Sequence, residues 1–339
     1  MEVTAMRRKI LSTAVLVAAL AAIFAATASA DGLPVLGIDV GSTGVASSSG
    51  AYRYVTIPAA SRTIVERVAA HGGQVLAWSS LRGTFTIPAV AYDGSAGGLS
   101  ADGKTLVLIE PRTSFPRTTT KLLVLSGDRL KVRHLVTLQG DFSFDAIAPA
   151  GSWLYVIHYL SPTDPTRYRV QAFDLQHGRL LTKPIVDPTE PGDKMRGNPL
   201  SRTLSADGRW AYTLYDGGGG TPFVHALDTV ARSAHCIDLD EIAAGTNLWQ
   251  LRLGIDSAGK HLVVRDGTTA KVLIDLRTLR TARARGVVAT RSPPPLLLGA
   301  AGAALVALVA GVITALRRRG QRSASGSDAP NCVGHPGDQ

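Results

Sequence analysis

The sequence is poor in the residue types from which catalytic and metal sites are usually built. Its 339 residues include only two cysteines, Cys236 and Cys332, and its eight histidines are scattered. It contains no HExxH zinc motif, no CxxC pair, no GxSxG elbow and no Walker phosphate loop. These absences argue against the common hydrolase arrangements, and we expect neither a cofactor nor a metal.

Charge is also sparse, at 18% of residues, and its sign bias is mild. The net charge is +10, but residues 31–292 hold 29 Lys and Arg against 23 Asp and Glu, without runs of either sign. A basic stripe with interleaved aromatic residues, which is typical of nucleic-acid binding, does not occur. The composition therefore predicts no nucleic-acid partner and leaves open an anionic ligand of the cell envelope.

What the sequence does contain is a turn that recurs five times. The clearest copy, LSADGRWAYTLYDG, covers residues 204–217. The anchoring glycines are spaced 53, 48, 57 and 51 residues apart: Gly50, Gly103, Gly151, Gly208 and Gly259. Self-similarity at such a period indicates a repeat architecture. Asp and Ser favour the turn, and Gly supplies the positive φ that a tight hairpin needs.

Each turn is followed by runs of residues that favour strands. The first run is rich in β-branched residues, aromatics and leucine, and a later one ends in an apolar residue and an aspartate, as in Phe173-Asp174, Leu227-Asp228 and Ile274-Asp275. Four strands in roughly 50 residues is the blade of a β-propeller. We therefore predict an all-β fold, a β-propeller of five to six four-stranded blades; a β-sandwich with coincidentally similar turns is the structural alternative.

The S-x-D-G-[KR]-x-L-x-V turn and strand, with Tyr-Val in the second strand, resembles the bacterial YVTN, TolB and WD40-like propeller superfamily. The resemblance extends over residues 44–285 and implies the fold more than the function, because such blades serve many roles. Two features depart from the pattern. Arg53 stands where the other copies have Leu or Ala, and residues 83–97 fit no blade, which leaves the blade count at five or six.

The two ends of the chain predict export and a membrane anchor. Residues 1–30 have the basic start, apolar stretch and Ala-Ser-Ala cleavage site of a signal peptide, with an uncleaved anchor as the alternative. Three prolines precede Leu296–Leu316, which is 21 residues without a charge, and arginines follow directly. That length spans a bilayer, and the arginines mark the cytoplasmic side. The predicted divisions are residues 1–30, an extracytoplasmic propeller at 31–292, a spacer and transmembrane helix at 293–316, and a short cytoplasmic tail at 317–339.

This topology has consequences for partners. Cys236 and Cys332 would lie on opposite sides of the cytoplasmic membrane and could not pair. Small residues at four-residue intervals leave open a homodimer through the transmembrane helix: Gly299, Ala303, Ala307 and Gly311. The bias toward Ala, Gly and Arg suggests a bacterial source.

A short stretch after the signal peptide suggests a different function. Residues 36–44, LGIDVGSTG, resemble the first phosphate-binding turn of the sugar kinase, Hsp70 and actin superfamily, in which Asp39 would lie near the metal. No second phosphate motif accompanies it. The preferred interpretation is a closing or entry strand of the propeller.

The repeats themselves suggest one candidate site. Asp145 and Arg202 each stand six residues before an anchoring glycine, so they occupy equivalent places on the inner strands of neighbouring blades. Such a pair either bonds across the blades or contacts a ligand in the axial funnel. We predict a non-enzymatic binding or scaffolding module for a protein or cell-envelope ligand, with these two residues as candidate ligand-binding groups. The alternative is a propeller lyase or hydrolase with its site at the channel mouth.

Overall fold

A computed structural model describes residues 44–190 and 195–284 of the chain. The predicted signal peptide, the phosphate-turn resemblance up to Thr43, the transmembrane helix and the tail all lie outside these ranges. In the part of the chain that is described, no helix is long and apolar enough to cross a membrane. The helical structure described consists of two single 3-10 turns, η1 (Gly217–Gly219) and η2 (Leu248–Gln250).

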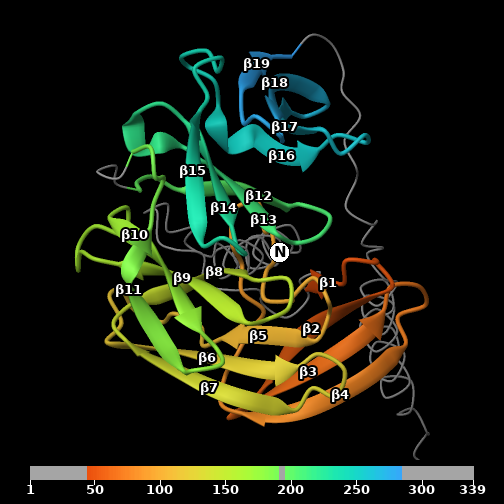
Figure 1. Cartoon of the computed structure of the whole chain (residues 1–339). Coiled ribbons are helices and arrows are strands. Elements are labelled where there is room, and N and C mark those ends of the chain that lie inside the picture. The colour runs from red at the N-terminus through yellow and green to blue at the C-terminus, as the bar shows by residue number, and fades with distance from the viewer. Residues whose placement is uncertain (1–43, 191–194, 285–339) are drawn as a thin grey trace, which may run out of the picture.

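The described chain folds into five antiparallel sheets that follow one another along the sequence (Figure 1). We call these sheets blades 1 to 5. Blade 1 has strands β1 (Val45–Ala46), β2 (Tyr52–Ala59), β3 (Arg62–Ala69) and β4 (Val75–Arg82). Blade 2 has β5 (Thr105–Ile109), β6 (Thr119–Ser126) and β7 (Val132–Gln139). Blade 3 has β8 (Phe142–Ile147), β9 (Trp153–Tyr159), β10 (Tyr168–Asp174) and β11 (Arg179–Ile185). Blade 4 has β12 (Pro199–Leu204), β13 (Trp210–Tyr215), β14 (Phe223–Asp228) and β15 (Ser233–Asp238), and blade 5 has β16 (Leu251–Ile255), β17 (His261–Asp266), β18 (Thr269–Asp275) and β19 (Thr281–Arg283).

Blade 2 differs from the predicted four-stranded pattern. Its inner position is occupied by an isolated bridge between Leu99 and Leu106 instead of a full strand. The N–H of Val107 donates to the carbonyl of Gly98 at 2.7 Å, which continues the same short pairing. Four strands per blade therefore holds for blades 1, 3, 4 and 5, and blade 2 has three strands with a bridged inner segment.

The five repeat turns have the same backbone geometry. Their glycines, Gly50, Gly103, Gly151, Gly208 and Gly259, have φ between 69° and 72°. Each glycine N–H donates to the carbonyl three residues earlier, at 2.8 to 3.0 Å. This left-handed conformation is costly for residues with a Cβ atom, which explains why glycine recurs. The first and faintest copy, at Gly50, is therefore a true member of the repeat.

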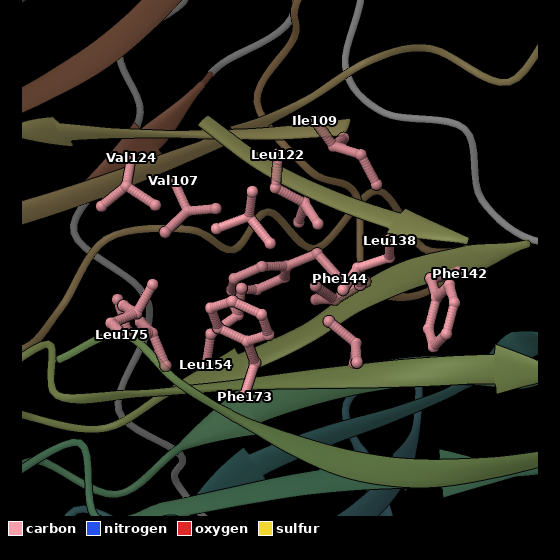
Figure 2. Close-up of a cluster of buried hydrophobic side chains, with 14 residues drawn as sticks. Val107, Ile109, Leu122, Val124, Leu138, Phe142, Phe144, Leu154, Phe173 and Leu175 are labelled. Atoms are coloured by element: carbon pink, nitrogen blue, oxygen red, sulfur yellow. The ribbon is translucent and has the colours of Figure 1, made fainter. Parts of the chain in front are cut away.

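Adjacent blades are held together by four buried apolar clusters, which join blades 1 and 2, 2 and 3, 3 and 4, and 4 and 5. Figure 2 shows the cluster between blades 2 and 3, where Phe144 and Phe173 pack against Leu154 and Val107. Among the described residues no such cluster joins blade 5 to blade 1. The described part is therefore an arc of five blades, and the sixth blade that the sequence left open is not among these residues.

Residues 83–97, which fit no predicted blade, form a small hairpin at the centre of this arc. We call it the axial hairpin. Ala89 pairs with Ala96, and the N–H of Val90 donates to the carbonyl of Ser95 at 2.8 Å. Residues 85–91 are all buried. At the tip, the N–H of Tyr92 donates to the carbonyl of Pro199 on the inner strand of blade 4 at 2.9 Å.

Candidate functional site at the mouth of the propeller

The two ends of the propeller are built from different loops. Because sequential strands alternate in direction, the five repeat turns all lie at one end, which we call the turn end. The loops β5–β6, β9–β10 and β13–β14 lie at the opposite end, together with the connections between blades. We call this end the mouth. The inner strands β8 and β12 run from the mouth to the turn end, so their side chains line the axis at increasing depth.

The structure brings the two predicted site residues together. Asp145 lies on β8 and Arg202 on β12, and their side chains are 1% and 5% exposed. The Arg202 Nη1 atom donates to the carbonyl of Asp145 at 2.8 Å, and Nη2 pairs with the Asp145 carboxylate. Pairing across the blades, one of the two alternatives given by the sequence, is therefore what the structure shows. Contact with a ligand stays a prediction.

A row of polar side chains extends outward from this pair across blade 4. Arg202 is directly opposite Thr213 on β13, which is opposite His225 on β14, so all three lie on the same face of the blade. Four buried atoms in this group have no hydrogen-bond partner in the described structure: Asp145 Oδ2, Arg202 Nε, Thr213 Oγ1 and His225 Nε2. Burial lowers the pKa of His225 to about 4, against an opposing effect of Asp145. His225 is thus neutral at physiological pH.

A second buried ion cluster lies closer to the mouth than this row, at Asp141, directly before β8. Arg112 Nη2 is 2.5 Å from Asp141 Oδ1, and the Arg117 N–H donates to Asp141 Oδ2 at 3.1 Å. The Arg112 guanidinium also lies over the Tyr159 ring, 4.9 Å from its centroid. Burial and the neighbouring Arg112 charge lower the pKa of Arg117 to about 10. Arg117 Nε lies 3.4 Å from Asp141 Oδ1, so two guanidinium groups share one carboxylate. Further bonds from the Arg117 guanidinium to the carbonyls of Glu110 and Phe142 fix the β5–β6 loop.

Tyrosines line the centre of the mouth. The ring centroids of Tyr159 and Tyr168 are 6.0 Å apart, and those of Tyr168 and Tyr215 are 6.1 Å apart. Together with Tyr92 and Pro199 they border a cavity of about 20 Å³. Burial raises the pKa of Tyr92 and of Tyr159 to about 12, so both are protonated phenols at neutral pH. A cavity of that size holds about one water molecule and not a substrate.

The axial hairpin explains why so little space remains. Its residues 85–91 are all buried against the neighbouring blades. Its tip is fixed to β12 through Tyr92 and through Asp93, whose N–H donates to the carbonyl of Leu200 at 3.1 Å. The sequence reasoning missed this element as well as Arg112, Asp141 and the tyrosines. A signal was present in residues 85–91, FTIPAVA, an apolar run without turn chemistry that belongs to no blade.

A larger depression, of about 580 Å³, lies away from the axis between the outer strand of blade 4 and the β18–β19 turn. The Cys236 N–H on β15 donates to Asp187 Oδ2 at 2.9 Å, and His235 Nδ1 lies 3.7 Å from the same oxygen. Within residues 44–190 and 195–284, no group of three or more His, Cys, Asp and Glu side chains is arranged to hold a metal.

The five antiparallel sheets and their equivalent turns define an all-β propeller architecture, which confirms the predicted all-β fold. The chain is similar to TolB from Acinetobacter baumannii, with 14% identity, a TM-score of 0.40, and coverage of 72% of this chain and 55% of that one. It is also similar to a putative TolB from Agrobacterium tumefaciens, with 13% identity, a TM-score of 0.40, and coverage of 73% and 81%. A third similar structure is the Cps50 (Swd1) β-propeller domain of Myceliophteria thermophila, with 13% identity, a TM-score of 0.40, and coverage of 72% and 66%.

No family model matches the sequence, and no curated protein sequence matches it either. At these identities, similarity to solved structures concerns the fold alone. The match spans only about half of the Acinetobacter TolB chain. The propeller architecture rests on the strand order and the five equivalent turns of this chain.

Proposed function

We propose that this protein is an exported, single-pass membrane protein whose propeller binds a protein or cell-envelope ligand through one of its outer faces. The observation that carries the binding role is the filled axis. The axial hairpin and the buried Asp145–Arg202 pair leave a cavity of only about 20 Å³ at the mouth. A propeller lyase or hydrolase, the alternative, would need space there for its substrate and groups that reach it.

Support for the anchor comes from the sequence. The signal peptide at residues 1–30 leads the chain out, and the apolar stretch at 296–316 with its following arginines leads it back in. The two ends agree on one orientation, with the propeller outside the cytoplasmic membrane and residues 317–339 inside. A homodimer through the small residues of the membrane helix belongs to the same proposal.

The anchor is tested on the full chain with a C-terminal tag, which is expressed in bacteria that are then converted to spheroplasts. We expect the protein to remain in the membrane pellet after alkaline carbonate extraction. Protease added outside should degrade the propeller and spare the tag. Release by carbonate, or digestion of the tag in intact spheroplasts, would contradict the proposal.

The binding role is tested by cross-linking the same full chain in membranes and purifying it after gentle solubilisation. We expect a defined partner that is retained by Trp78→Ala, a change of an exposed side chain on the outer strand of blade 1. A single-residue change on the binding face should abolish the cross-link, and a scan of exposed residues at both ends will locate that face. Turnover of small envelope metabolites by purified protein without any cross-linked partner would favour the enzyme alternative.

A further inference from the structure

Both ends of the described chain leave the propeller in the same direction. β1 is an inner strand that runs from the mouth toward the turn end, so Gly44, the first described residue, lies at its mouth end. β19 is the outer strand of blade 5 and runs the opposite way, back to the mouth. Its last bond, from the Ala284 N–H to the carbonyl of Lys271 at 3.0 Å, lies near the start of β18, which is at the mouth. The predicted membrane helix therefore follows a chain end that lies at the mouth.

The mouth also exposes large apolar side chains from three separate elements. Tyr92 at the tip of the axial hairpin is 36% exposed, Leu160 in the β9–β10 loop 51%, and Trp249 in η2 50%. The Tyr92 and Trp249 rings meet edge to face with centroids 5.3 Å apart. Aromatic side chains with one apolar body and one polar end are enriched where proteins meet lipid headgroups.

Exposure alone does not distinguish the two ends, since Leu204 (49%) and Val230 (55%) are equally exposed at the turn end. The place where the chain leaves the propeller toward the predicted membrane helix does distinguish the two ends. Residues 285–295 separate the last described residue from the predicted membrane helix. Eleven residues reach at most about 40 Å when fully extended. Presenting the turn end to the membrane would require this short segment to run along the whole height of a blade, whereas presenting the mouth requires no such detour.

We propose that the mouth, with Tyr92, Leu160 and Trp249, is the face that lies on the lipid headgroups of the bilayer, and that the five repeat turns point away from it. This inference rests on the membrane anchor proposed above. It also identifies the turn end as the face that is free to meet a partner. The occupant of the mouth is then the bilayer surface and not a soluble protein.

The test uses the full chain with Cys236→Ser and Cys332→Ser, reconstituted in lipid nanodiscs. Single cysteines are placed at the mouth by Leu160→Cys or Trp249→Cys, and at the turn end by Leu204→Cys or Val230→Cys, which match them in exposure. Labelling by a bulky, membrane-impermeant maleimide is measured for each variant and normalised to its rate in SDS. We expect the two mouth positions to react about tenfold more slowly than the two turn positions, because a headgroup-bound face is shielded. In detergent this difference should shrink.

Equal labelling at both ends, or slower labelling at the turn end, would overturn the inference. Vesicle flotation of the same chain separates this outcome from a failure of the anchor. A chain that floats but labels equally at both ends keeps the proposed anchor and refutes the orientation. A chain that does not float refutes the anchor and the orientation together.

Discussion

The phenolic hydroxyl of Tyr155 in blade 3 donates a hydrogen bond to the carbonyl of Thr229 in blade 4, at 2.7 Å. Tyr54 in blade 1 makes the equivalent 2.7 Å bond to the carbonyl of Gly127 in blade 2. Both tyrosines stand four residues after an anchoring glycine and are fully buried. The same repeat position therefore links two pairs of neighbouring blades. Its chemistry is that of a large apolar side chain with one polar end that must be satisfied.

Tyr155→Phe should lower the free energy of unfolding by about 1 kcal/mol, because it removes one buried hydrogen bond and the Thr229 carbonyl loses its donor from Tyr155. Urea unfolding of the full chain in detergent, followed by the emission of its tryptophans, measures the change. Tyr212→Phe is the matched control, since Tyr212 holds the same repeat position but makes no such bond in the described structure. A loss from Tyr212→Phe as large as that from Tyr155→Phe would contradict the interblade role.

The turn that accepts the Tyr54 bond should tolerate no larger residue at Gly127. A Cβ atom there would lie 1.9 Å from the carbonyl oxygen of Gly103 in the repeat turn. Gly127→Ala should therefore cost about 3 kcal/mol, because backbone on both sides must move. Gly73→Ala, in an open turn of blade 1 with no atom within 4 Å, should cost only about 1 kcal/mol from its positive φ. Similar melting temperatures for the two variants would show that the Gly103 and Gly127 turns separate easily.

The sequence predicted the repeating part of this fold well because the repeat is local. A turn bounded by Ser, Asp and Gly fixes its own geometry, and all five glycines adopt it. The same pattern placed Asp145 and Arg202 on neighbouring inner strands, and their contact across the blades was one of its stated outcomes. It did not predict the register shift at Asp145, which has no partner on β9, whereas Arg202 pairs with Thr213. The axial hairpin was not predictable in this way. Its burial depends on Phe144 and Pro199, which lie in other blades, and its own residues carry no repeat signature.

The mouth was missed for a similar reason. Arg112 and Asp141 are 29 residues apart and meet only because β8 follows blade 2 at the same end as the β5–β6 loop. The tyrosines come from separate strands and loops, with no common spacing. Their convergence is a product of ring geometry, which a single sequence does not specify.

Removal of one partner of the Asp145–Arg202 pair should lower the free energy of unfolding strongly. Arg202→Met would leave the Asp145 carboxylate buried without a counter-ion, and we expect a loss of about 3 to 5 kcal/mol. The double variant Asp145→Leu with Arg202→Met should recover much of that loss, because it removes both charges. Urea unfolding of the two variants measures the difference. If the double variant is as unstable as Arg202→Met, packing rather than uncompensated charge determines the effect.

The last prediction concerns the loss of stability as the pH is lowered. His225 has a pKa of about 4 in the folded protein and an ordinary value of 6.5 when unfolded. Between these values the unfolded chain binds more protons than the folded one, so stability falls as the pH is lowered from about 6.5 toward 4. The full effect of His225 is about 3 kcal/mol. Burial lowers the pKa of His158 as well, which adds a change of the same sign.

His225→Gln removes the titrating group and should flatten the pH dependence of unfolding in this window, while the part that His158 contributes remains. The lowered pKa values of carboxylates such as Asp228 contribute mainly below about pH 5, so the profiles are compared above that pH. The control is Trp78→Ala, which changes an exposed side chain that does not titrate and should leave the profile unchanged. An unaltered profile in His225→Gln would mean that His225 is already accessible to protons in the folded state, and that the blade 3–4 interface opens more readily than its packing indicates.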